Sequence, residues 1–130
     1  MDELFILGTT SSIDFPTTTN SYDTSFNGGT PLDMSNGLGI NYINGSDIFV
    51  SKISADGANL LGSTYIGGSG NDGLNRTSIT ASDDTLRYNY ADEIRGEIEI
   101  DQNNNIYVGT CTQSTDFPTT NNSFQANFGG

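Results

Sequence analysis

The sequence has no histidine, no tryptophan and one cysteine, Cys111. Without histidine the chain lacks the commonest general base and the commonest transition-metal ligand of proteins. A single cysteine allows no disulfide within the chain. No basic residue stands near Cys111 in the sequence to activate its thiol, so we expect a small buried side chain in a strand.

Basic residues are also scarce, with 4 Lys and Arg against 16 Asp and Glu and a net charge of −12. Such a surface repels phosphate backbones and anionic lipids, so nucleic acid and membrane surfaces are not expected partners. No apolar run is long enough to span a bilayer, and the acidic N-terminus does not resemble a signal peptide. An acidic surface suits a soluble extracellular protein, or one that collects divalent cations.

Helical patterns are missing too. Hydrophobic residues make up only 33% of the chain, and no window carries apolar residues at i, i+3, i+4 and i+7 over a helical length. Gly, Asn, Ser and Thr take their place, and these residues disfavour helices and supply turns. The sequence therefore predicts an all-β fold of short strands with many turns.

The chain contains an internal repeat. Residues 5–18 read FILGTTSSIDFPTT and residues 106–120 read IYVGTCTQSTDFPTT, and the similarity continues from 21–29 into 123–130. Asp14 and Asp116 are equivalent, 102 residues apart (116 minus 14). Two propeller blades would fit this length, but no further copy of DFPTT stands near the midpoint, so we interpret the spacing as one enlarged unit.

Four strands are expected within that unit, at residues 47–53, 60–68, 97–101 and 106–112. The first pair is joined by SADGAN, whose Asp-Gly favours a hairpin turn, and the second pair by DQNNN. Glu97 and Glu99 alternate with Ile98 and Ile100, which predicts one solvated and one apolar strand face. Two successive antiparallel hairpins are what a four-stranded propeller blade requires.

The stretch GGSGNDGLN, residues 67–75, fits the nonapeptide of calcium-binding parallel β-helices. The next nine residues, RTSITASDD, contain no glycine and do not continue the pattern, so we interpret the stretch as a turn at a blade edge. Its glycines then serve positive φ or close backbone approach. Asp72 remains a candidate metal ligand, and Ca²⁺ is the cofactor that this stretch suggests.

The segments DIFVSKISADGANLLGSTYIGGSGND, IEIDQNNNIYVGT and STDFPTTNNSFQ together resemble the SBBP repeat, a bacterial β-propeller repeat. The resemblance covers the whole chain apart from two insertions. It implies blades of four antiparallel strands and a place in a large secreted or surface-exposed bacterial protein. It leaves the chemistry open.

The resemblance divides the chain into parts. Residues 1–29 would be the end of one blade, residues 30–46 an insertion, and residues 47–130 one enlarged repeat with a second insertion at 73–95. Both long loops are expected on the same face, opposite the turns SADGAN and DQNNN. Insertions often form the binding face of repeat proteins, so Tyr42, Tyr88 and Tyr90 are candidate binding residues. An equally open interpretation is that the insertions bind nothing and simply pack on each other.

No catalytic motif was found. DQNNN lacks the glycine and the glutamate of an EF-hand, and the sequence has no G-x-S-x-G, P-loop or HExxH. The acids between Asp83 and Asp101 contain no pair that spacing selects for glycosidase chemistry. The expected function is a non-enzymatic, extracellular module of a bacterial surface protein with a structural, adhesive or protein-binding role. The alternative is a propeller that binds or processes carbohydrate through its insertion-bearing face.

A single enlarged blade with part of another cannot close a propeller. The sequence therefore leads us to expect a partial propeller, a fragment of a larger protein. Its partners would be neighbouring blades or other copies of itself, besides a protein or glycan at the cell surface.

Overall fold

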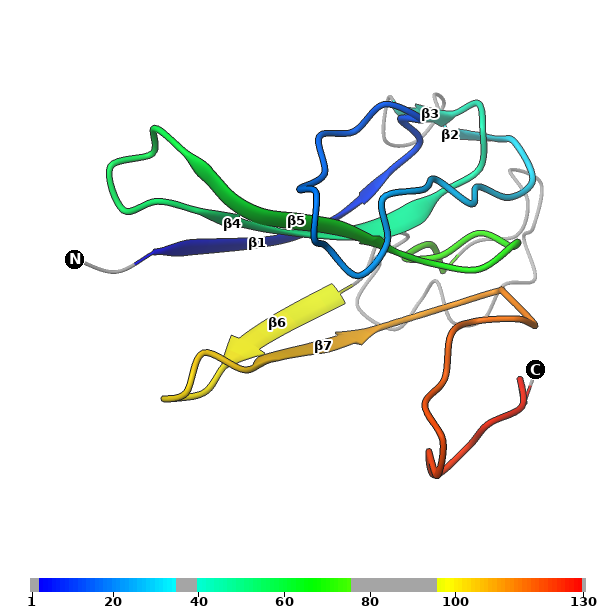
Figure 1. Ribbon diagram of the computed structural model, residues 1–130. Coiled ribbons are helices and arrows are strands. Elements are labelled where there is room, and N and C mark those ends of the chain that lie inside the picture. The colour runs from blue at the N-terminus through cyan, green and yellow to red at the C-terminus, as the bar shows by residue number, and fades with distance from the viewer. Residues whose placement is uncertain (1–2, 35–39, 76–95, 130) are drawn as a thin grey trace.

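A computed structural model describes residues 3–34, 40–75 and 96–129 (Figure 1). These ranges contain seven strands and no helix, and every strand pair is antiparallel. The predicted all-β class is confirmed. The strands form one three-stranded sheet and two hairpins, with no closed sheet within the described ranges. A propeller arrangement therefore stays a prediction.

The three-stranded sheet has the order β1-β4-β5, from β1 (Leu4–Thr10), β4 (Asp47–Ile53) and β5 (Leu60–Ile66). Its strands are rich in β-branched and aromatic residues, which pack well on a pleated surface. Ile48, Val50 and Tyr65 are buried. Between β4 and β5, Ser51 and Ser63 face each other with their hydroxyl oxygens 2.9 Å apart, which satisfies both buried groups.

Strands β6 (Gly96–Ile100) and β7 (Ile106–Thr110) form the second predicted hairpin. As expected, Glu97 and Glu99 are exposed, while Ile98 and Ile100 are half-buried. The hairpin lies beside the three-stranded sheet as a second layer (Figure 1). Cys111 follows β7 and is half-buried, so the prediction of a buried strand residue was only partly right.

Residues 30–46, expected as a loop insertion, contain a third hairpin of β2 (Leu32–Met34) and β3 (Ile40–Tyr42). Leu32 and Tyr42 are buried together with Leu74 in a small apolar cluster. This cluster explains why the segment is structured, because two short strands gain stability once one face is covered. The second insertion lies mostly outside the described residues.

The two tight turns, 54–59 and 101–105, lie at the same end of the molecule (Figure 1). In the second turn the Asp101 carboxylate accepts hydrogen bonds from the N–H groups of Asn103 and Asn105, both 2.8 Å long. Asn104 adopts a φ of 63°, which asparagine tolerates well. The β2–β3 hairpin lies toward the other end (Figure 1), which agrees with the expected placement of the first insertion.

The sequence repeat is also a structural repeat. The Ser21 N–H donates to the Thr18 carbonyl (3.0 Å), and 102 residues later the Ser123 N–H donates to the Thr120 carbonyl (3.1 Å). Likewise the N–H groups of Ser12 and Ser114 donate to the hydroxyls of Thr10 and Thr112, at 3.1 and 3.0 Å. We call residues 11–29 the first arm and residues 113–129 the second arm.

Candidate functional site

The two arms meet at a glycine-rich segment, residues 67–73, which we call the junction turn. At one side the Asp72 N–H donates to the Ser46 carbonyl (2.8 Å). At the other side the Gly73 N–H donates to the Cys111 carbonyl and the Gln113 N–H donates to the Asn71 carbonyl, both 2.9 Å long. The junction turn thus connects the start of β4 with the segment that follows β7.

Glycine is required in this turn for two reasons. Gly73 adopts a φ of +76°, which disfavours any side chain. Gly70 has an ordinary φ, but a Cβ there would stand 2.8 Å from the Gln113 carbonyl oxygen. The sequence-based interpretation of GGSGNDGLN as a turn with positive φ and close backbone approach is confirmed.

Asp72, the weak metal-ligand candidate, is fully buried in the junction turn. Its carboxylate accepts hydrogen bonds from the Gly68 N–H (2.8 Å), the Ser114 hydroxyl (2.7 Å) and the Thr112 hydroxyl. Donors from the junction turn and from the segment after β7 therefore compensate for the burial of this carboxylate. The arrangement gives Asp72 a structural role that requires no cation.

Asp47 is the second buried carboxylate, and its oxygens accept hydrogen bonds from the N–H groups of Asn27 (2.6 Å) and Gly28 (3.2 Å). Burial raises the pKa of Asp47 to about 6, the hydrogen bond from Asn27 opposes this shift, and the nearby Asp72 adds to it. A Cβ on Gly67 would stand 2.5 Å from Asp47 Oδ1 and 3.0 Å from Asp72 Oδ2. The two carboxylates thus flank the same glycine.

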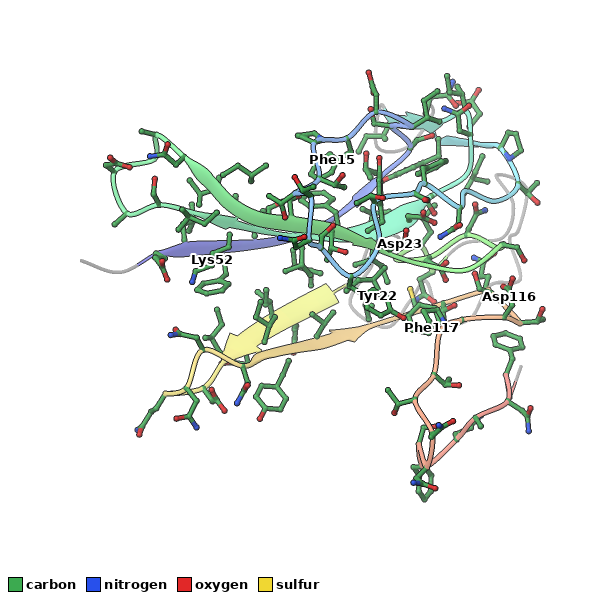
Figure 2. All side chains as sticks on the ribbon, viewed as in Figure 1. Phe15, Tyr22, Asp23, Lys52, Asp116 and Phe117 are labelled. Carbon is green, nitrogen blue, oxygen red and sulfur yellow. The ribbon has the colours of Figure 1, made fainter. Side chains whose placement is uncertain are left out.

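A surface pocket of about 450 Å³ opens over the junction turn, between the two arms. The first arm contributes Tyr22, Asp23 and Asn27, and the second arm contributes Asp116 and Pro118. Figure 2 labels Tyr22, Asp23 and Asp116 on the ribbon. We call this hollow the arm pocket, and its floor is formed by the backbone of residues 67–69.

The arm pocket is polar and acidic. The Asp116 Oδ1 accepts hydrogen bonds from the Ser69 N–H (2.8 Å) and the Ser69 hydroxyl (3.0 Å), which hold the pKa of Asp116 below its ordinary value. The Tyr22 ring is 71% exposed at the rim. An exposed aromatic ring beside carboxylate and amide acceptors can bind a ligand that has both an apolar face and hydroxyl donors.

The residues predicted for binding are placed differently. Tyr42 is 4% exposed and packs in the cluster with Leu32 and Leu74, so its ring is not presented at a surface. Tyr88 and Tyr90 lie outside the described residues.

Sequence reasoning missed Tyr22, Asp23 and Asp116 as a group. The repeat could have indicated these residues, because Asp14 and Asp116 lie at equivalent positions near the start of the two arms. The sequence does not show, however, that the two arms meet.

Within the described residues, no group of three or more Asp, Glu, Cys or His side chains is arranged to hold a metal ion. Those ranges also contain no helix of a length and apolarity suited to crossing a membrane.

Comparison with known proteins adds no family assignment. No protein-family model, no curated protein and no solved structure matches the chain.

Proposed function

We propose that this chain is a non-enzymatic repeat module of a bacterial surface or secreted protein, of the β-propeller type suggested by the SBBP resemblance. Its role is structural and adhesive, through contacts with other proteins. The observation that carries the proposal is the repeat of 102 residues, in which equivalent backbone hydrogen bonds recur in both arms. Recurrence of one unit in sequence and conformation is typical of repeat proteins, which present surfaces for binding.

The strand order supports a blade of four strands. Strand β1 is equivalent to β7, since both precede an arm, and β1 pairs with β4, which pairs with β5. Strand β7 pairs with β6. Merging the equivalent strands gives the order β6-β7-β4-β5, an antiparallel meander of the kind found in propeller blades.

The lack of histidine and the charge of −12 favour a binding module over a catalyst and disfavour nucleic acid as a partner. An extracellular location follows from the resemblance and suits the acidic surface. Neighbouring blades or further copies of the chain are the expected structural partners.

The test is a binding array of extracellular proteins and glycans, incubated with the labelled chain and then analysed by mass spectrometry for altered array components. We expect saturable binding to at least one component, with every component recovered chemically unchanged. Turnover of a component would contradict the non-enzymatic role, and no binding to any component would contradict the adhesive role.

A second candidate function is carbohydrate binding at the arm pocket, favoured by the exposed Tyr22 ring beside Asp23 and Asp116. Tyr22→Ala should abolish glycan binding. Tyr107→Ala is a matched control, because Tyr107 is also exposed (59%) but lies on β7, away from the pocket. Glycan binding that both variants retain, or that both lose, would reject the arm pocket as the site.

A further inference from the structure

Tyr65 of β5 is enclosed by the first arm. Its hydroxyl donates to the Ser12 carbonyl (2.8 Å) and accepts from the Phe15 N–H (2.9 Å). Its own N–H donates to the Asp23 carbonyl (3.0 Å). The rings of Phe15 and Phe26 lie 5.9 and 5.8 Å from the Tyr65 ring. Ser12, Phe15, Asp23 and Phe26 thus form a socket that satisfies both the ring and the hydroxyl of one tyrosine.

The first arm also contacts the two residues before Tyr65. The Thr18 N–H donates to the Ser63 carbonyl (3.0 Å), and the Ser63 N–H donates to the Thr18 hydroxyl (3.1 Å). The Asp23 N–H donates to the Thr64 hydroxyl (2.9 Å), which donates back to the Asp23 carbonyl (3.0 Å). The first arm therefore recognises a Ser-Thr-Tyr strand through both main-chain and side-chain groups.

The second arm forms the same socket without a tyrosine in it. A pocket of about 510 Å³ is lined by Ser114, Phe117, Gln125 and Phe128. Each of these residues lies 102 positions after a member of the first socket. We call this pocket the second socket. Its backbone shares two hydrogen bonds with the first arm, at Ser12 and Ser114 and at Ser21 and Ser123. The arms differ at Asn122, whose φ is 69°, while its equivalent Asn20 has no positive φ.

The second socket is open where the first is filled. Phe128 is 44% exposed, whereas its equivalent Phe26 is half-buried against Tyr65. Among the described residues, the N–H groups of Thr120 and Gln125 have no acceptor, while their equivalents Thr18 and Asp23 bind the strand. The sequence Ser-Thr-Tyr occurs once in the chain, at 63–65. The chain therefore has two sockets but only one Ser-Thr-Tyr strand to fill them.

We propose that the second socket binds a β-strand bearing Ser-Thr-Tyr that lies outside these 130 residues, with the tyrosine ring between Phe117 and Phe128. The tyrosine hydroxyl would donate to the Ser114 carbonyl and accept from the Phe117 N–H, as the Tyr65 hydroxyl does with Ser12 and Phe15 in the first socket. It would replace the 3.4 Å hydrogen bond that the Phe117 N–H donates to the Ser114 carbonyl in the open socket. This names the partner chemistry for the protein-binding role above and rests on it. The recognition mode is strand addition, in which main-chain hydrogen bonds give affinity and a side-chain pocket gives specificity.

An intact second copy of this chain is a poor source of the strand. Its Tyr65 already fills its own first socket, so docking would break one set of contacts to form an equivalent one. The exchange leaves the number of filled sockets unchanged. A strand that is not already held by an arm gains all the contacts that Tyr65 makes in the first socket, and is the favoured occupant.

The test uses the full chain and a fluorescent peptide that copies residues 46–69, measured by anisotropy. We expect saturable binding that Phe128→Ala in the chain weakens by about tenfold or more, the effect of losing roughly 1.4 kcal/mol at a buried aromatic contact. Phe124→Ala is the matched control, because Phe124 is fully exposed and does not line the socket. A peptide carrying Tyr65→Ala should not bind.

Three results would overturn the proposal: no saturable binding, equal binding to the Phe128→Ala chain, or equal binding of the Tyr65→Ala peptide. A Phe26→Ala chain separates the two sockets, since weakening by Phe26→Ala alone would mean that the peptide displaces β5 from the first socket. Circular dichroism of each variant establishes that it is folded. If the chain did not bind the peptide but still bound components of the array, the second socket would be rejected as a binding site and the adhesive role would remain supported.

Discussion

The Ser114 hydroxyl lies 2.7 Å from Asp72 Oδ2 and donates to it across 42 positions of sequence. Both residues are buried, so the bond connects the junction turn to the second arm without competition from water. The first arm is held differently, by β5. The two arms therefore share equivalent backbone hydrogen bonds but have different supports.

Removal of the Asp72 carboxylate should destabilise the fold strongly. In Asp72→Ala the Gly68 N–H and the hydroxyls of Ser114 and Thr112 lose their acceptor. Hydrogen bonds to a charged group contribute about 1.5–3 kcal/mol each, with incomplete additivity, so the free energy of unfolding should fall by about 3 kcal/mol or more. Urea denaturation measures it. The control is Asp14→Ala, at an exposed carboxylate, which should cost under about 1 kcal/mol.

Calcium should not stabilise the described fold. The Asp72 carboxylate already accepts three hydrogen bonds, and no metal-binding group of acids occurs among the described residues. We expect the same melting temperature with millimolar CaCl₂ and with a chelator. A melting temperature that rises with calcium, and does so less in Asp72→Asn, would instead identify Asp72 as a ligand.

Stability should decrease as the pH rises from about 5 to about 7.5. The pKa of Asp47 is raised from 3.8 to about 6 in the folded state, mainly by burial, so the folded protein binds a proton more tightly than the unfolded chain. The stabilisation by this proton is complete below the unfolded pKa and is lost as the pH passes through about 6. Between pH 5 and pH 7.5 the expected loss is about 1–1.5 kcal/mol, because part of the proton's stabilisation is already lost between the unfolded pKa and pH 5.

Urea denaturation at both pH values tests this, with Asp47→Asn as the matched variant. Asparagine cannot ionise, so its free energy of unfolding should change less over the same interval, whatever its absolute value. The exposed carboxylates Asp56, Asp101 and Asp116 have lowered pKa values, so the stabilisation that they contribute is lost only as the pH falls below about 5. A wild-type protein that is equally stable at both pH values would contradict a raised pKa of Asp47 in the folded state.

Gly70→Ala should be much more damaging than Gly109→Ala. A Cβ on Gly70 meets the backbone of Gln113 and Ser114 at 2.8–3.0 Å, and backbone atoms fixed by the junction turn cannot move aside easily. We expect a cost of about 2–3 kcal/mol. A Cβ on Gly109 meets nothing within 4 Å, and alanine there should be neutral or slightly stabilising. Equal effects of the two substitutions in thermal denaturation would disprove the close approach.

Much of the strand structure could be predicted from sequence. Alternating apolar residues and turn dipeptides identified β4, β5, β6 and β7 to within two residues at their ends, because these signals are local. The β2–β3 hairpin was missed, since its stability comes from the distant Leu74. The meeting of Tyr22 with Asp116 was missed for the same reason, because it depends on how the two arms fold onto the junction turn.

The repeat itself was visible in the sequence, but its consequence was not. Aligning residues 12–26 with 114–128 gives no indication that Tyr65 fills one arm and leaves the other open. That asymmetry follows from the pairing of β4 with β1 rather than with β7, a long-range choice between two similar strands, and β5 then pairs with β4.

Amide hydrogen exchange by NMR tests the central claim, that a Ser-Thr-Tyr strand occupies the first of two equivalent arms and leaves the second open. The amides of Phe15, Thr18 and Asp23 should be protected, because each donates to β5. The equivalent amides of Thr120 and Gln125, which have no acceptor among the described residues, should exchange faster by about tenfold or more. Both should become protected when the 46–69 peptide is added. Equal protection of both sets without peptide, or no protection of the second set with it, would contradict the account.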